Sequence, residues 1–203
     1  GQCVLAMGHT DADYETAKDA IERGVSACTH TFNVMSLFHQ HRPAVMGAVL
    51  ERPVYCEAIC DGRHLHPGTV RMLLACKGWD KVVAITDSMQ AAGLPDGEYM
   101  LGVNPVTVTD GDAKITGTDI RAGSTLTLAQ AVKKIARFTG APPEKVLGLL
   151  TANPARLIGE DHRRGDIAVG KDADFVVLSE ELDILETWSA GEKVYDNRRP
   201  ANS

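Results

Sequence analysis

The sequence predicts an α/β fold in which part of a β/α barrel is followed by a small β unit. Two observations carry this prediction. Short apolar runs alternate with segments of helical period over the first half of the chain, which is typical of a parallel sheet with buried strands. The pattern then changes to short alternating β runs over residues 98–120 and to a hairpin-like segment near the end.

The expected barrel strands are apolar runs that stop at glycine or polar residues. They lie at residues 2–7, 25–30, 54–60 and 81–86. Between the first two, residues 8–24 predict a turn plus a helix with N-cap candidates at Thr10 and Asp11 and a stop at Gly24. Residues 66–78 predict a second helix with Pro67 in its first turn. A polar loop containing FHQHRP covers residues 38–43.

The second half of the chain contains turn signals as well as helical segments. Asp110-Gly111 and Thr116-Gly117 predict tight turns between short strands. The final segment, ILETWSAGEKVYD, has Ala190-Gly191 at its expected bend. We expect two further helices, at residues 125–139 and 143–158.

Composition excludes several classes of partner. The net charge of −6 and pI near 5.6 argue against nucleic acid and anionic membranes, because phosphate contacts need clustered Lys and Arg. No apolar run approaches the about 18 residues that a membrane span requires. The five cysteines form no CxxC pair, so we expect reduced thiols in a cytoplasmic protein. The chain starts in mid-strand without an initiator Met, which suggests a piece of something longer.

The four expected barrel strands all end in polar residues that can bind a metal ion or transfer a proton. These strand ends carry His9, His30, the run from Asp61 to His64, and Asp87. In a β/α barrel the carboxyl ends of the strands form one rim, so these side chains should converge. A lone His at a strand end is usually a capping or core residue, but four such endings in succession favour a metal or acid/base site. Three further histidines are expected in loops beside this rim, either as substrate contacts or as exposed residues: His39, His41 and His66. His162 should be solvated.

Seven motifs resemble the N-acetylglucosamine-6-phosphate deacetylases of the amidohydrolase superfamily. They run in register over nearly the whole chain: GHTDADY, THTFNVM, DGRHLHP, AITDSMQAAG, AGSTLTLAQAV, LTANPARLIG and GDIAVGKDADFVVL. The resemblance implies the C-terminal half of a TIM-like (β/α)8 barrel plus part of a small β-sandwich domain. On that basis residues 1–160 form the partial barrel, with a β insertion at about 98–120, and residues 161–203 form strands of the small β domain.

The resemblance also implies roles for individual residues. His9 and His30 match the family's metal-binding histidines, and Asp87 matches its catalytic acid/base. His64, Asn33 and the backbone of Val34 match contacts to the sugar phosphate. The loop formed by Ala122, Gly123 and Ser124 matches one that closes on the substrate. The cofactor is a divalent metal ion, zinc or iron first and manganese or cobalt as alternatives.

Two departures from the family pattern concern the phosphate and the metal. The family usually places an Arg after its THxFN motif, where it holds the 6-phosphate across a homodimer interface. In this sequence His41 occupies the position of that Arg. Arg42 could hold the phosphate in its place only if the loop is shifted by one residue. Arg121 is another unusual residue near this pocket. The family's metal-binding Glu comes from an earlier strand that these residues do not contain, so a half barrel with two open sheet edges is expected.

The leading hypothesis is metal-dependent deacetylation of N-acetylglucosamine-6-phosphate, a small-molecule amino-sugar phosphate, by a full-length homodimer. One alternative is another amidohydrolase, such as an N-acyl amino acid deacylase or a dihydroorotase-like enzyme. A second alternative is an inactive fragment that needs its missing half. A zinc-dependent binding module is disfavoured because the expected ligand set has no Cys.

Overall fold

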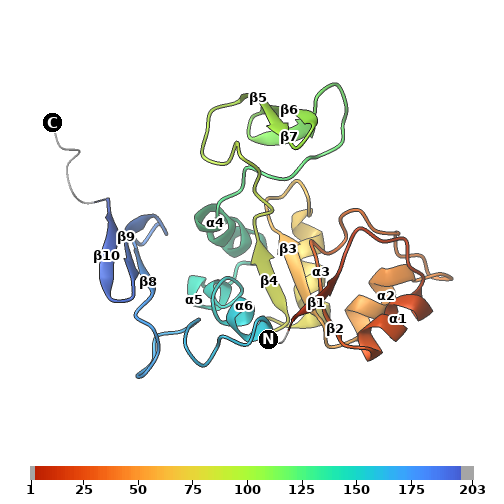
Figure 1. Ribbon diagram of the computed structural model, residues 1–203, viewed down its shortest axis with the longest axis horizontal. Coiled ribbons are helices and arrows are strands. Elements are labelled where there is room, and N and C mark those ends of the chain that lie inside the picture. Colours follow the sequence, from red (N-terminus) through yellow and green to blue (C-terminus); the bar gives the residue numbers. More distant parts are fainter. Residues whose placement is uncertain (1–2, 198–203) are drawn as a thin grey trace.

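The computed structural model describes residues 3–197 and centres on a four-stranded parallel sheet (Figure 1). Its strands follow one another in chain order, so the first and last strands form the two edges of the sheet. This arrangement is the expected portion of a β/α barrel. The strands are β1 (Leu5–Met7), β2 (Val25–Cys28), β3 (Tyr55–Ile59) and β4 (Val82–Ile85).

The described residues form six helices around this sheet, with α1 and α2 on the β1 side and α4 to α6 on the β4 side (Figure 1). None of the helices within residues 3–197 has the length and apolarity that crossing a bilayer requires. Their bounds are α1 (Tyr14–Glu22), α2 (Ala44–Glu51), α3 (Pro67–Lys77), α4 (Leu128–Thr139), α5 (Pro143–Leu147) and α6 (Ala152–Leu157).

The main apolar core lies on the helix side of the sheet. Cys28, Cys56 and Val82 are register neighbours across β2, β3 and β4, and all three pack in this core with residues of α2 and α3. Glu57 and Val83, one position along the strands, are register partners outside this core. Because side chains alternate across a strand, they lie on the opposite face, which corresponds to the interior of a barrel.

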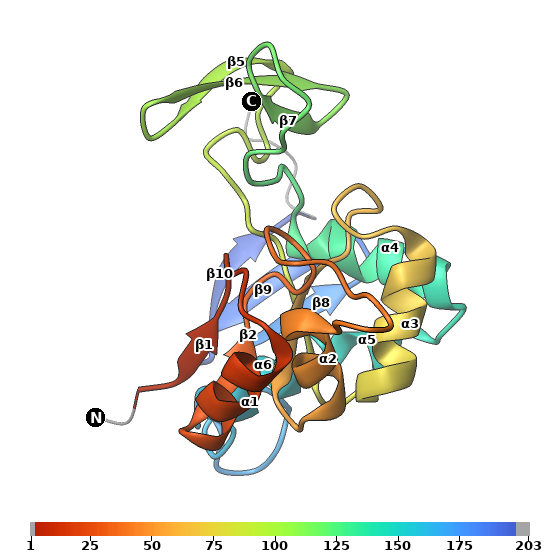
Figure 2. The ribbon, with the colours of Figure 1, turned by 90° about the vertical axis from the view of Figure 1, so that its right-hand side faces the viewer.

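A second sheet lies beyond the carboxyl ends of β1 to β4, at the top of Figure 2. It is antiparallel in the order β5-β6-β7 and has a small core of its own that includes Val106 and Val108. Asp110 and Gly111 have φ of 52° and 71° at the β6–β7 turn, as the Asp-Gly signal predicts. The strands are β5 (Gly97–Leu101), β6 (Asn104–Thr109) and β7 (Asp112–Ile115).

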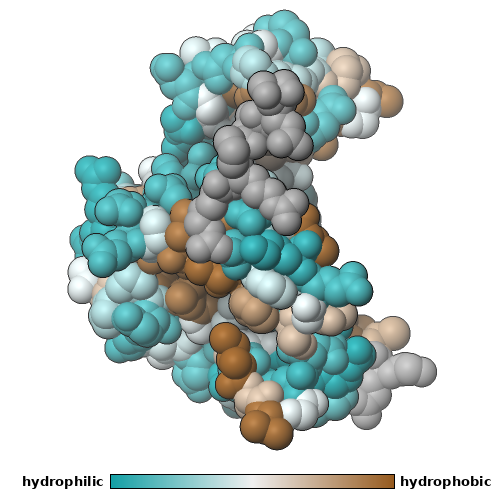
Figure 3. Space-filling view, turned by 90° about the vertical axis from the view of Figure 1, so that its left-hand side faces the viewer, coloured by the Kyte–Doolittle hydropathy of each residue, from teal (hydrophilic) through white to brown (hydrophobic). Residues whose placement is uncertain are grey.

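The C-terminal sheet lies beside α5 and contains β8 (Phe175–Leu178), β9 (Ile184–Ser189) and β10 (Glu192–Asp196). It is antiparallel in the order β10-β9-β8, and Ala190-Gly191 forms the expected bend, with φ of 50° and 81°. Apolar surface is visible on this side of the molecule (Figure 3). Exposed apolar residues of this region include Ile167, Val169, Val176, Val194 and Tyr195.

Three expectations about the elements were wrong. Helix α2 was not expected, because its short sequence AVMGAVLE has no polar face to mark a helical period. Helix α1 is capped by Asp13, which accepts from the Thr16 N–H at 2.8 Å, and not by Thr10 or Asp11. Residues 143–158 form two helices, α5 and α6, instead of one. The domain division at residue 160 stays a prediction.

Candidate active site

The carboxyl ends of the four parallel strands bring the predicted site residues to one edge of the sheet. His9, His30 and Asp87 lie just beyond β1, β2 and β4, and all three have positive φ, at 47°, 30° and 49°. Positive φ is strained for non-glycine residues and persists only where the surrounding structure enforces it. The same strain at three strand ends makes this rim the candidate functional site.

The two histidines meet because β1 and β2 approach closely at their ends. A Cβ on Gly8 would lie 2.9 Å from the Thr29 Cβ, so a glycine is required there. The His9 and His30 ring centroids are 4.6 Å apart, with their planes tilted by 58°. His30 is 7% exposed, whereas His9 is exposed to solvent.

The chemistry of this pair fits a divalent cation. The buried Nδ1 of His30 has no hydrogen-bond partner, although buried polar atoms are almost always satisfied. Imidazole nitrogens are common ligands of zinc and iron. Among residues 3–197, however, no group of three or more His, Cys, Asp or Glu side chains could hold a metal ion. His9 and His30 therefore supply part of a ligand set, and their metal-binding role stays a prediction.

Glu57 is a site residue that sequence reasoning missed. It lies on the interior face of β3, half-buried, and its carboxylate interacts with the main-chain N–H of His30 and with the charge of Asp87. Burial raises the pKa of Glu57, His30 opposes this through its main-chain N–H and its ring, and the Asp87 carboxylate adds a smaller upward effect. The available signal was a single charged residue inside the buried strand YCEAI.

The loop after His30 is folded back onto the histidine. The Asn33 amide group donates to the carbonyls of His30 and Thr31 at 3.0 and 3.3 Å, and its main-chain N–H donates to the His30 carbonyl at 2.9 Å. These bonds occupy the amide nitrogen and leave Oδ1 to contact a ligand. Val34 is 65% exposed with φ of 51°. The contacts of Asn33 and Val34 with a sugar phosphate stay a prediction.

His64 is held by a carboxylate at the end of β3. Its Nδ1 lies 2.7 Å from Asp61 Oδ2, and both side chains are 9% exposed. Burial alone would raise the pKa of Asp61, but the hydrogen bonds from His64 and from the main-chain N–H of Arg63 hold it below its ordinary value. The position of the His64 ring is therefore fixed from one side.

The segment of Ala122, Gly123 and Ser124 packs against the backbone that carries Asp87. The Ser124 N–H donates to the Asp87 carbonyl at 2.8 Å, and the Ser124 hydroxyl donates to the Thr86 carbonyl. Gly123 has φ of 64°, and a Cβ there would lie 3.1 Å from the Asp87 carbonyl oxygen. These contacts position Asp87, while the predicted closure of this loop on a substrate stays a prediction.

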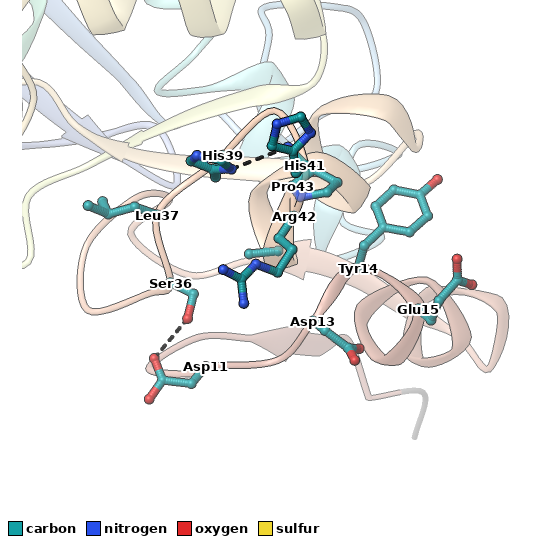
Figure 4. A pocket seen from close by; sticks show the side chains of 11 residues that line it. Asp11, Asp13, Tyr14, Glu15, Ser36, Leu37, His39, His41, Arg42 and Pro43 are labelled. Atoms are coloured by element: carbon teal, nitrogen blue, oxygen red, sulfur yellow. Dashed lines mark hydrogen bonds between the residues drawn. The ribbon is translucent and has the colours of Figure 1, made fainter.

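The two candidates for the phosphate-binding cation line a separate cavity of about 710 Å³ beside this rim. Arg42 points its guanidinium toward the side of the cavity formed by Ser36 and Asp11, whereas the His41 ring points away from it (Figure 4). The Ser36 hydroxyl donates to Asp11 at 3.0 Å. The geometry therefore favours Arg42 over His41 as the cation of this cavity.

The remaining residues of this region have structural contacts. Arg121 forms a two-pronged ion pair with Asp112, at 2.9 and 3.1 Å, so its guanidinium is occupied. His66 caps α3 by accepting from the Gly68 N–H at 3.1 Å. His162 is exposed, as expected for a solvated residue.

Comparisons with known proteins place this chain in a family. The model of the amidohydrolase family matches residues 2–194. An N-acetylglucosamine-6-phosphate deacetylase from Vibrio furnissii is 39% identical over 95% of this chain and 48% of its own length. The crystal structure of the same enzyme from Pasteurella multocida has a TM-score of 0.91 at 32% identity, over 96% of this chain and 51% of that one.

A structure from Mycobacterium smegmatis, determined in complex with N-acetyl-D-glucosamine-6-phosphate, has a TM-score of 0.88 at 36% identity. It covers 94% of this chain and 51% of that one, so the chain spans about half the length of the relatives it matches. These matches confirm the resemblance drawn from the sequence motifs and the partial-barrel fold. The chain belongs to the amidohydrolase family.

Proposed function

We propose that this chain is the C-terminal half of a metal-dependent enzyme that hydrolyses the N-acetyl group of N-acetylglucosamine-6-phosphate. The products are glucosamine-6-phosphate and acetate. The observation that carries the proposal is the contact of the His9 and His30 rings at the same carboxyl-end rim that carries Asp87, in a fold whose relatives are named for this reaction. Below, "parent enzyme" means the chain of full family length that contains these residues.

His9 and His30 would hold the divalent metal, zinc or iron first and manganese or cobalt as alternatives. When bound, such an ion supplies an activated water and polarises the amide carbonyl. Asp87 takes the proton of the attacking water as general base and then delivers it to the departing amine as general acid. The exposed carboxylate of Asp87 on a fixed backbone suits both steps.

The substrate's sugar and phosphate would be held by residues of the strand-end rim and of the loop that follows His30. His64, fixed by Asp61, and Asn33 with the Val34 backbone contact the sugar phosphate. The loop of Ala122, Gly123 and Ser124 closes the site on the side of Asp87. Arg42 binds the 6-phosphate through its guanidinium, in keeping with its direction in the cavity.

The parent enzyme is proposed to act as a homodimer in the cytoplasm. Arg42 lies on an exposed loop beside an open cavity, a place from which it can reach a partner's substrate. The cysteines of the described residues are all free thiols, which supports a reducing compartment.

The test is a deacetylation assay of the parent enzyme on N-acetylglucosamine-6-phosphate and on unphosphorylated N-acetylglucosamine. Asp87→Asn removes the proton acceptor and should lower kcat by at least about 100-fold, the usual range for loss of a general acid or base. Arg42→Ala should raise KM for the phosphorylated sugar, whereas His41→Ala, its neighbour and matched control, should leave KM unchanged. Activity on neither sugar, with metal still bound, would favour another N-acyl substrate and refute the proposal.

A further inference from the structure

The turn between β6 and β7 is hydrogen-bonded on all sides by side chains. The N–H groups of Asp110 and Gly111 both donate to the Asp96 carboxylate, which lies just before β5. The Gly111 carbonyl accepts from the Thr125 hydroxyl at 2.7 Å, and the Asp110 carbonyl accepts from the Arg63 guanidinium at 2.5 Å. Carbonyls at the centre of a hairpin turn lack a partner in the ladder and are usually left to water. This turn is instead held by three separate segments of the chain.

The β5–β7 sheet is attached beyond the end of β4 through a stalk, which we define as residues 87–89 and 124–126. Ser88 and Ser124 pair there as a parallel bridge, and the Ser124 N–H donates to the Asp87 carbonyl at 2.8 Å. Both connections between the sheet and the rest of the chain therefore leave from one place (Figure 2). An attachment at one place leaves the sheet free to tilt.

Arg63 attaches the same sheet to a second strand end. It follows β3, and its guanidinium reaches Asp110, a residue 47 positions away in the chain. The backbone of Arg63 is itself fixed, because its N–H donates to the Asp61 carboxylate at 2.7 Å. The same carboxylate holds the His64 ring at 2.7 Å. One short turn thus directs His64 to the rim and Arg63 to the sheet above it.

The position of the sheet determines the position of the backbone around Asp87. The segment from Ala122 to Ser124 continues from the sheet, since the Ala122 N–H donates to the Ala113 carbonyl of β7 at 3.1 Å. At its other end, Ser124 is bonded to the Asp87 carbonyl. A tilt of the sheet would pull this segment away from Asp87, and the Arg63 bond opposes such a tilt.

We propose that Arg63 is a positioning residue, which holds the β5–β7 sheet over the strand-end rim and thereby fixes the segment that packs on Asp87. The structural part of this inference requires neither a metal nor a substrate. Its consequence for catalysis rests on the proposed function, in which Asp87 is the general acid and base.

The first test is hydrogen–deuterium exchange of the parent enzyme, followed by mass spectrometry of peptides from residues 104–116 and 120–126. Arg63→Ala should speed exchange in both peptides at least about fivefold, because the sheet then opens locally while the barrel stays folded. Arg63→Lys keeps a cationic donor and should restore part of the protection. Arg23→Ala is the matched control, since it removes an exposed arginine that bonds only within its own helix, to Asp19, and exchange should not change.

The second test is deacetylation of N-acetylglucosamine-6-phosphate by the same variants. Misplacement of Asp87 should lower kcat of Arg63→Ala about 10-fold, with a smaller change in KM. Arg63→Lys should recover part of kcat, and Arg23→Ala should match the unmodified enzyme.

The outcomes separate the inference from the proposed function. Unchanged exchange in Arg63→Ala would refute the attachment, whatever happens to the activity. Faster exchange with an unchanged kcat would refute the positioning of Asp87 and leave the proposed function standing. If the unmodified enzyme is inactive on both sugars, the proposed function fails, and the exchange rates alone then confirm or refute the attachment.

Discussion

The four-stranded sheet and the C-terminal sheet are built in opposite ways. The first packs on its own helices through side chains such as Ile59, Leu73 and Ile135, all 0% exposed. In the second, Glu186 is buried while Val176 and Val194 are 47% and 62% exposed. A sheet with its own helices is stabilised by apolar burial, whereas a sheet whose apolar side chains stay exposed in the described part of the chain depends on turns and polar contacts.

Polar and aromatic contacts hold the C-terminal sheet. The Trp188 indole N–H and the Lys193 ammonium both donate to Glu186, at 2.8 and 3.0 Å. Phe175 stacks on Trp188 with ring centroids 5.4 Å apart. The exposed apolar residues of this sheet would be covered by another layer in a sandwich, as the family resemblance implies.

The comparison is tested most strongly by truncating one apolar side chain in each sheet region. Leu73→Ala leaves a cavity in the core behind the four-stranded sheet and should lower the free energy of unfolding by about 2–5 kcal/mol. Val194→Ala, at an exposed position of β10, should change it by less than about 0.5 kcal/mol. Urea unfolding of this chain measures both, and similar losses would contradict the difference between the regions.

A smaller effect is expected for carboxylates that hold turns in the two regions. Asp61→Asn weakens bonds to His64 and to the Arg63 and His64 N–H groups, and should cost about 2 kcal/mol at pH 7. Asp174→Asn is the matched control, because Asp174 accepts one main-chain bond, from the Ala190 N–H, and pairs with Arg164 at 3.7 Å at a more exposed site. It should cost less than about 1 kcal/mol.

The Asp61 effect should also depend on pH. The folded-state pKa of Asp61 lies below its ordinary value of 3.8, so its contribution is complete above that pH and is lost as pH falls below it. Unfolding curves at pH 7 and at about pH 3 should therefore show a smaller Asp61→Asn penalty at the lower pH. An unchanged penalty would show that charge is not the cause.

The smallest expected effect concerns the reactivity of the cysteine thiols and involves no change in stability. Burial raises the pKa of Cys28 and Cys60 to about 12 and that of Cys56 to about 11, so these thiols lack the reactive thiolate at pH 8. Cys3 and Cys76 are exposed. Iodoacetamide with intact-mass detection should modify two thiols quickly and the other three only in urea. Fast reaction of all five would mean that the helix-side core is open.

The order of the barrel elements was predictable from sequence because it depends on local patterns. Apolar runs alternating with helical periods gave the parallel strands, and their polar ends gave the rim with His9, His30 and Asp87. Asp110-Gly111 and Ala190-Gly191 specify hairpin turns through their own conformational preferences. These features need no knowledge of distant contacts.

The features that sequence reasoning missed depend on contacts between distant segments. Thr10 was expected as a cap, but it forms a bridge with Met35 and leaves the cap to Asp13. The importance of Glu57 depends on which face of β3 it occupies and on where His30 lies. The choice between His41 and Arg42 depends on side-chain directions in a short turn, which residue spacing does not specify.

The central claim is that the strand ends of this chain supply half of a metal centre. The most direct test is a crystal structure of the metal-loaded parent enzyme with anomalous scattering data. Our account predicts one anomalous peak within about 2.0–2.1 Å of an imidazole nitrogen of both His9 and His30, the usual zinc–nitrogen distance. A peak elsewhere, or a metal-loaded site that leaves either histidine unbound, would contradict it.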